Sequence, residues 1–390
     1  MTKKIRDSIS MLKRYDELDS IRGLAALTVV LGHYYNVYRS SEIVKISTEN
    51  VNFLIASIIK FSPLHLFWAG HEAVILFFIL SGFVLSLPYY GSRHEPSYTT
   101  YIVKRFLRIY VPYIVAISFS ALLRIVFSEG GIPELTYWFN VIWVEPITME
   151  NIINHILLIG DYNTGTFNGV TWSLVHEMRI SLVFPFVVLF LKKINSFYAV
   201  AIAFGLSWLS FYFIDYYRIG NINNIFYSLH YLSYFMIGST LSKHRDKIAT
   251  FYCSKKSYIK SAIVLIAIFL YTYKWSFFYN IKEIHSVFIN DWIICLGASS
   301  IIGITLSSGL ISNLLRNNSV TFLGKISYSL YLYHVAVQFT FIYLLYSKIP
   351  LLLILFLSLA VTLIISFLSY KFIELPSINL GRKIVMKNEK

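Results

Sequence analysis

The chain has few charged residues for its length, and the shortage is concentrated in long segments. Only 14% of its 390 residues are charged, against roughly 25% in an ordinary soluble domain, whereas 56% are hydrophobic. The charges collect in short clusters. Between them lie apolar runs of about 20 residues, the length of a helix that crosses a bilayer. This composition excludes a soluble globular domain and predicts an all-α integral membrane protein.

Other absences narrow the class further. The two cysteines, Cys253 and Cys295, lie in different segments, so we expect no disulfide, and no residue spacing is typical of a metal site. No small-residue cleavage site follows the first apolar run, which contains Arg22, so we interpret this run as an uncleaved span. No internal repeat or low-complexity tract divides the sequence, which predicts one membrane domain.

The apolar runs predict about ten transmembrane helices. We place them at residues 20–38, 72–92, 108–128, 172–191, 198–217, 225–242, 261–277, 290–310, 326–346 and 350–371. Two weaker segments, 52–68 and 138–159, are interpreted as interfacial or re-entrant helices, because irregular backbone is not tolerated in contact with lipid.

The distribution of Lys and Arg orients these spans. The net charge of +14 is not a nucleic-acid signature, because the basic residues alternate with spans instead of forming one patch. Segments on the side of the N-terminus carry 24 Lys and Arg, and those on the other side carry 7. Cytoplasmic loops are enriched in these residues, so both termini are predicted to be cytoplasmic. We expect a basic N-terminus at 1–19, a membrane domain at 20–376 and a basic tail at 377–390.

The first span carries two ionisable residues, Arg22 and His33, and such residues inside a membrane are functional candidates. They are ~20° apart around a helix and ~16 Å apart along it. This spacing places Arg22 near the cytoplasmic boundary and His33 at or beyond the midplane, which suits a ligand lying along the helix. The alternative is that Arg22 contacts lipid headgroups and His33 bonds a neighbouring helix.

Two arginines lie at the start of the third span. Arg105 and Arg108 are three residues apart, so they face the same way on a helix, and Lys104 precedes them. A pair of guanidinium groups suits phosphate recognition. The alternative is the ordinary positive charge of a cytoplasmic loop.

The fourth and ninth spans each carry a polar face. Ser173, His176 and Glu177 are predicted to line one face of the fourth span near the outer surface, and Arg179 is a candidate internal ion-pair partner. In the ninth span, Ser327, Tyr331 and His334 form a polar stripe, which either lines a cavity or joins helices.

The second and tenth spans add three further candidates. His71 and Glu72 lie near the outer boundary of the second span, where they are either solvated or in contact with a substrate. Gly82 within the same span favours close helix packing. Glu374, near the cytoplasmic end of the tenth span, lies among basic residues, which indicates a cap, a salt bridge or a binding role.

Taken together, these segments resemble the acyltransferase-3 family of integral membrane acyltransferases from about residue 15 to residue 376. The similar motifs are LDSIRGLAALTVVLGH, FFILSGFVLS, KRFLRIYVP, TWSLVHE, LGKISYSLYLYH and FIELP. The sequence departs from the family pattern after Glu177, where Met178 and Arg179 replace a further acidic residue. We therefore expect no role that requires paired carboxylates there. Some relatives carry an additional extracytoplasmic hydrolase-like domain, for which we expect no room.

The resemblance implies transfer of an acyl group, usually acetyl, from cytoplasmic acetyl-CoA to a hydroxyl of a cell-envelope carbohydrate. Arg105 and Arg108, helped by Lys104, are expected to hold the CoA phosphates, and Arg22 is expected to steer the pantetheine phosphate or to align the thioester. His33 is expected to act as general base or to accept the acyl group itself. The residues expected to orient or bind the acceptor are Glu177, Trp172, Ser173, His334, Glu72 and Glu374.

Several alternatives remain open from the sequence. A transporter or flippase of a polar or lipid-linked glycan would also line a path with intramembrane charges, and an inactive sensor or complex subunit would keep the same fold. The acceptor, the acyl length, the oligomeric state and the choice between direct and two-step transfer leave no signal in the sequence. No metal is expected, and the resemblance implies a multi-pass protein of the bacterial plasma membrane.

Overall fold

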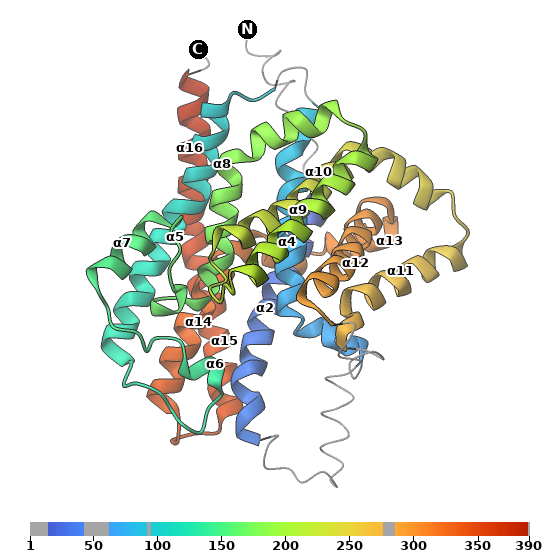
Figure 1. Cartoon of the computed structure of the whole chain (residues 1–390). Helices are drawn as coiled ribbons and strands as arrows, with labels where there is room; N and C mark the ends of the chain where they lie inside the picture. The colour runs from blue at the N-terminus through green and yellow to red at the C-terminus, as the bar shows by residue number, and fades with distance from the viewer. Residues whose placement is uncertain (1–14, 43–61, 92–94, 276–284, 389–390) are drawn as a thin grey trace.

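The computed structural model describes residues 15–42, 62–91, 95–275 and 285–388, and every regular element within them is helical (Figure 1). The α-helices are α2 (Asp16–Glu42), α4 (Gly70–Gly91), α5 (Tyr98–Phe127), α6 (Tyr137–Asn140), α7 (Met149–Leu157), α8 (Trp172–Lys193), α9 (Ser196–Tyr216), α10 (Ile225–Cys253), α11 (Ser257–Thr272), α12 (Val287–Ser307), α13 (Gly309–Leu315), α14 (Asn318–Leu345), α15 (Leu351–Ser369) and α16 (Leu375–Asn388). Short 3-10 turns are η1 (Pro63–Phe67), η2 (Thr164–Thr166), η3 (Gly169–Thr171) and η4 (Tyr273–Trp275), and η6 (Tyr370–Glu374) is a π-helical turn. The all-α class is confirmed.

Eight of the described helices are long and apolar enough to cross a membrane, so the chain is a polytopic membrane protein. They are α4, α5, α8 with η3, α9, α11 with η4, α12, α14, and α15 with η6 and α16. The other two expected spans coincide with α2 and α10, of 27 and 29 residues. Both are long enough to cross. Charged residues lower their mean hydropathy, at 16–22 in α2 and 243–247 in α10, so their crossing stays a prediction.

Three expected segments differ in detail. Residues 52–61 of the first weak segment lie outside the described residues, and its end forms η1. The second weak segment contains α6 and α7, two short helices rather than one. The tenth span does not end at residue 371, because η6 continues α15 into α16, which packs against α5. Most of the expected tail at 377–390 is therefore helical.

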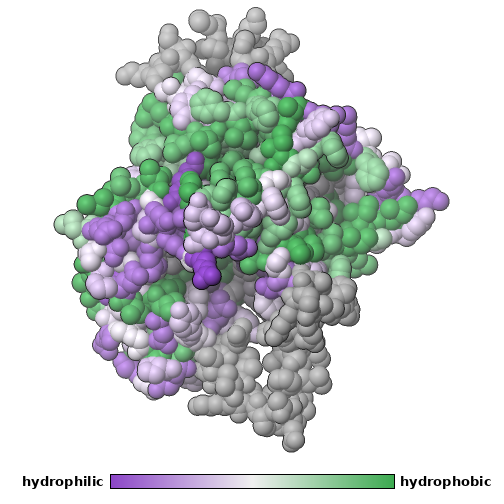
Figure 2. All heavy atoms as spheres, viewed as in Figure 1, coloured by the Kyte–Doolittle hydropathy of each residue, from purple (hydrophilic) through white to green (hydrophobic). Residues whose placement is uncertain are grey.

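The outward faces of several helices are apolar. Hydrophobic residues cover most of the middle of the face drawn in Figure 2, and hydrophilic residues gather at its lower left and right edge. In α9 and α11 only 28% and 22% of the apolar window is buried, against 72% in α14. Such large exposed apolar faces need another hydrophobic phase. We therefore place α14 at the centre of the bundle and α9 and α11 against lipid.

The central contact joins α2 to α14, and glycines make it possible. A Cβ on Gly23 would overlap the backbone nitrogen of Gly324, and a Cβ on Gly324 would lie 2.6 Å from the carbonyl oxygen of Asp19. Small residues at helix interfaces let the two backbones approach closely. The two helices thus touch backbone to backbone near the start of α2.

A second crossing of this kind joins α4 to α10. A Cβ on Gly82 would overlap the carbonyl of Phe235, and a Cβ on Gly238 would overlap the carbonyl of Ile79. Each glycine lies against the backbone of the other helix. This supports the interpretation of Gly82 as a packing residue.

Replacing Gly324 with Ala tests the central crossing. The added methyl group has to separate α2 from α14, and overpacking of this kind costs about 1–3 kcal/mol. We expect a lower unfolding temperature in detergent. Gly205→Ala is the matched control, because nothing lies within 4 Å of a Cβ placed there in α9. Equal unfolding temperatures for the two variants would contradict the close crossing.

Candidate active site

His33 lies edge to edge with His334. The Nδ1 atom of His33 is 2.8 Å from Nε2 of His334, and the two rings are within 11° of parallel. The ring of Trp138, from the short helix α6, lies nearly parallel to His33 with 4.9 Å between centroids. The imidazole of His33, on α2, is therefore held by groups from two other elements, α6 and α14.

The backbone of α14 determines which nitrogen of each histidine carries a proton. Nδ1 of His334 lies 2.8 Å from the carbonyl of Tyr331 and 3.1 Å from that of Leu330. Because a carbonyl oxygen only accepts, we assign the proton of neutral His334 to Nδ1, which leaves Nε2 as an acceptor. Nδ1 of His33 then donates to that atom. The lone pair of neutral His33 is consequently on Nε2, as a base or nucleophile requires.

His33 borders a cavity of about 280 Å³. The cavity is lined by Val29, Gly32, His33, Tyr35, Asn36, His65, Trp68, Gly70, His71, Glu72, Val74, Trp172, Trp275 and Tyr331. Of the predicted acceptor-binding residues, Trp172 and Glu72 line this cavity. Ser173 and His334 lie behind it. The Ser173 hydroxyl is 2.7 Å from the hydroxyl of Tyr331, which itself donates to the carbonyl of Val170 at 2.7 Å.

Glu72 is buried instead of solvated, although it lies in the first turn of α4. The indole nitrogen of Trp275 donates to its Oε1 at 2.9 Å, and Nε2 of His65 lies 3.9 Å from the same oxygen. Only 2% of Glu72 is exposed. The solvated interpretation of this residue is therefore wrong.

The arginines of the first and third spans converge at the other end of the bundle. Arg105 forms an ion pair with Glu177, and its Nε donates to the Ser181 hydroxyl at 2.9 Å. Arg22 pairs with Asp19 at 3.2 Å. Arg108 is exposed and has no hydrogen bond or ion pair to any of the described residues. One guanidinium group of the three is thus left available to an anion.

Glu374 supplies negative charge to the same region. It is buried in the π-helical turn η6, where the hydroxyl of Ser329 donates to its Oε2 at 2.9 Å. It attracts both Arg108 and Arg22, whereas Arg22 and Arg105 repel Arg108. The fold brings these charged groups together from α2, α5 and η6.

Residues 15–371 match the sequence model of a family described as an acyltransferase domain. The chain belongs to this acyltransferase family. Acyltransferase MdmB of Streptomyces mycarofaciens is 28% identical over 131 residues, which are 34% of this chain and 32% of that protein. The chain thus matches about a third of the length of that relative. No solved structure matches.

The protein is a multi-pass membrane member of this family, and the geometry revises one expected grouping of site residues. Ser173, His176 and Glu177 do not form one site on α8. Glu177 joins Arg105, with Ser81 donating to it at 3.2 Å, whereas His176 contacts the Ser228 hydroxyl at 2.8 Å on α10. Consecutive helical residues point ~100° apart, which separates His176 from Glu177.

Arg179 does not form an ion pair with a carboxylate among the described residues. Its guanidinium donates to the carbonyls of Ile159 at 2.9 Å and Gly160 at 2.6 Å, and also to the carbonyl of Asn223. It therefore ties the segment after α7 to the start of α10. The expected ion-pair role is replaced by binding of backbone carbonyls.

Trp138 and Arg124 are site components that sequence reasoning missed. Arg124, inside α5, donates to the carbonyls of Thr166 and Glu145, and the Thr166 hydroxyl donates to the Glu145 carboxylate at 3.0 Å. These bonds join α5 to the segment 129–171, which contains α6. Two features of the sequence could have pointed to these residues. Arg124 is a charged residue inside a predicted span, and Trp138 lies in a weak hydrophobic segment.

A double-mutant cycle on Arg105 and Glu177 measures the coupling energy of this ion pair, which lies in the group of charges around the arginines. Their side chains are 10% and 20% exposed, and we expect Arg105→Gln and Glu177→Gln to show a coupling of about 0.5–3 kcal/mol in detergent unfolding. The control pair is Lys192 and Glu95, which are 43% and 42% exposed and should couple by less than about 1 kcal/mol. Equal coupling energies in the two cycles would contradict the view that the Arg105–Glu177 pair is partly shielded from water.

Proposed function

We propose that this membrane acyltransferase moves an acyl group, acetyl by default, from cytoplasmic acyl-CoA to a hydroxyl of a cell-envelope carbohydrate. An exopolysaccharide or a lipid-linked glycan is the expected acceptor. The observation that carries the proposal is the arrangement along α2. The arginine cluster of Arg22, Arg105 and Arg108 lies near one end of α2. At the other end, His33 borders a cavity and has an available lone pair.

The arginine cluster is the proposed site for the phosphates of the donor. Arg108 has no partner among the described residues, and Arg105 and Lys104 lie on the same helix. Guanidinium groups match phosphate geometry through several donors at once. The pantetheine arm separates the phosphates of CoA from its thioester, as ~16 Å of helix separates Arg22 from His33.

His33 is the proposed catalytic residue. In direct transfer, Nε2 takes the proton of the acceptor hydroxyl while the oxygen attacks the thioester carbonyl, and the departing thiolate is then protonated. In two-step transfer, Nε2 attacks the carbonyl first and passes the acyl group on. Both routes need the lone pair that His334 places on Nε2 by accepting from Nδ1.

The cavity next to His33 is the proposed acceptor site. Trp172 offers an indole face to a sugar ring, and Glu72 also lines the cavity. Ser173 supports the cavity through Tyr331, and His334 supports it through His33. Glu374 and Glu177 have a different role in the proposal, since they balance the charge of the arginine cluster.

The first test uses membrane vesicles that contain either wild-type protein or His33→Ala. Acetyl-CoA labelled in the acetyl group is supplied with and without an envelope glycan extract. We expect label in the glycan with the wild type alone, since His33→Ala removes the base while the protein stays folded. Turnover retained by His33→Ala would exclude this residue from the chemistry. Glycan movement without CoA release would instead support a transporter.

The donor site is tested by Arg108→Ala. Loss of a charged hydrogen bond of about 1.5–3 kcal/mol should raise the KM for acetyl-CoA about 10- to 100-fold and leave kcat nearly unchanged. We expect a smaller change with 3′-dephospho-acetyl-CoA if Arg108 binds the 3′-phosphate. Lys193→Ala, at the cytoplasmic end of α8, is the control. An unchanged KM in Arg108→Ala would contradict the assignment.

A further inference from the structure

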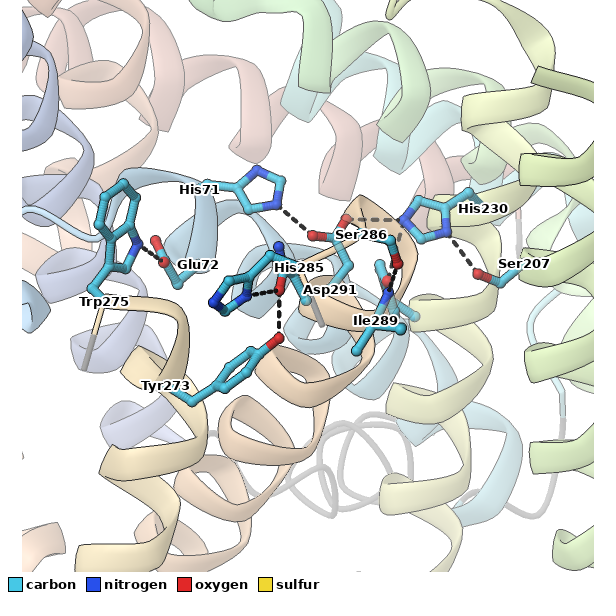
Figure 3. Close-up of polar contacts among 12 residues, drawn as sticks. His71, Glu72, Ser207, His230, Tyr273, Trp275, His285, Ser286, Ile289 and Asp291 are labelled. Carbon is cyan, nitrogen blue, oxygen red and sulfur yellow. Dashed lines mark hydrogen bonds and ion pairs between the residues drawn. The ribbon is translucent and has the colours of Figure 1, made fainter. Parts of the chain in front are cut away.

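A series of hydrogen-bonded histidine and carboxylate groups, His71, Asp291 and His230, leads from the same cavity to α12 and α10 (Figure 3). Nε2 of His71 lies 2.7 Å from Oδ1 of Asp291, whose Oδ2 lies 3.1 Å from Nε2 of His230. Nδ1 of His230 is 2.7 Å from the hydroxyl of Ser207. Figure 3 shows His71 and His230 on opposite sides of Asp291. The carboxylate is therefore bound on both sides by imidazoles.

Only one end of this series meets the cavity. The side chain of His71 is 45% exposed and lines the cavity together with His33, whereas those of Asp291 and His230 are 1% and 0% exposed. His230 is also bonded to the hydroxyl of Tyr234 at 3.1 Å. The buried part of the series thus supports His71, and His71 is the member that a bound molecule can touch.

The carboxylate also determines the tautomer of His71. An ionised carboxylate only accepts, so Nε2 of His71 carries the proton and neutral His71 has its lone pair on Nδ1. No described residue forms a hydrogen bond with this Nδ1. In their neutral forms, His33 and His71 each have an available lone pair, and both rings line one cavity of about 280 Å³.

We propose that His71 is the general base that binds and deprotonates the acceptor hydroxyl, with Asp291 as its positioning residue. This leaves His33 to receive the acyl group from acyl-CoA. The inference rests on the proposed function, and it assigns the residues that act on the acceptor. It selects two-step transfer, with one histidine for each step.

The two steps balance as follows in atoms and protons. Nε2 of His33 bonds to the thioester carbonyl carbon, the carbon–sulfur bond breaks, and CoA leaves as its thiolate. The acceptor oxygen then attacks the same carbon, the bond to Nε2 breaks, and Nδ1 of His71 takes the hydroxyl proton. His71 becomes an imidazolium paired with Asp291, and its proton is finally lost through solvent to the thiolate.

His71→Gln tests the proposal with two acceptors. Vesicles receive labelled acetyl-CoA with either envelope glycan extract or hydroxylamine, a nucleophile that attacks without a general base. We expect transfer to glycan to fall about 10²- to 10⁴-fold, the usual contribution of a general base, while acetyl hydroxamate forms within about threefold of the wild-type rate. His33→Ala should lose both products. His285→Gln, a nearby histidine outside the cavity lining, should keep both.

Asp291→Asn gives a second, independent variant. An amide can present N–H to the ring and favour the wrong tautomer, so glycan transfer should fall at least tenfold while hydroxamate formation persists. A purely structural role would reduce both products together in either variant, and that result would overturn the proposal. Unchanged glycan transfer by His71→Gln would overturn this inference alone. A wild type that transfers no label to glycan would overturn the proposed function and this inference with it.

Discussion

The backbone contact between α2 and α14 at Gly23 and Gly324 is the constraint on which the proposed chemistry depends. Each helix reaches its histidine ten residues after its glycine, His33 in α2 and His334 in α14. Because the two helices run in the same direction, the equal rise of ~15 Å brings both rings to one depth. Their hydrogen bond, and the tautomer of His33 that follows from it, are thus consequences of a helix crossing that only glycine permits.

Charge is separated along the same axis. The arginines collect near the start of α2, where Glu177 and Glu374 offset part of their charge, and His33 and His334 lie beyond them. Like charges repel one another, so these carboxylates are what allows several guanidinium groups to lie close together. The charge left over at Arg108 gives the inner end a preference for anions. The outer end has no such preference and suits an uncharged hydroxyl.

The features that could be predicted from the sequence are those that depend on a single helix. Hydropathy located the helices, and the 11-residue interval placed Arg22 and His33 at different depths. It could not predict that His33 meets His334, or that His71 meets Asp291 some 220 residues later, because periodicity within a helix carries no information about which helices pack together. Glu177 was singled out by type, but its partner Arg105 depends on the packing of α8 against α5.

Two histidines on one cavity have a chemical consequence that one would not have. When Nε2 of His33 carries an acyl group, its other nitrogen still holds the proton directed at His334, so the ring has no lone pair for the acceptor. A two-step route therefore requires a separate base, whereas a direct route does not. His71 meets that requirement by position and by tautomer. The buried carboxylate of Asp291 can stabilise the imidazolium that forms there, which gives its place between two histidines a purpose in the second step.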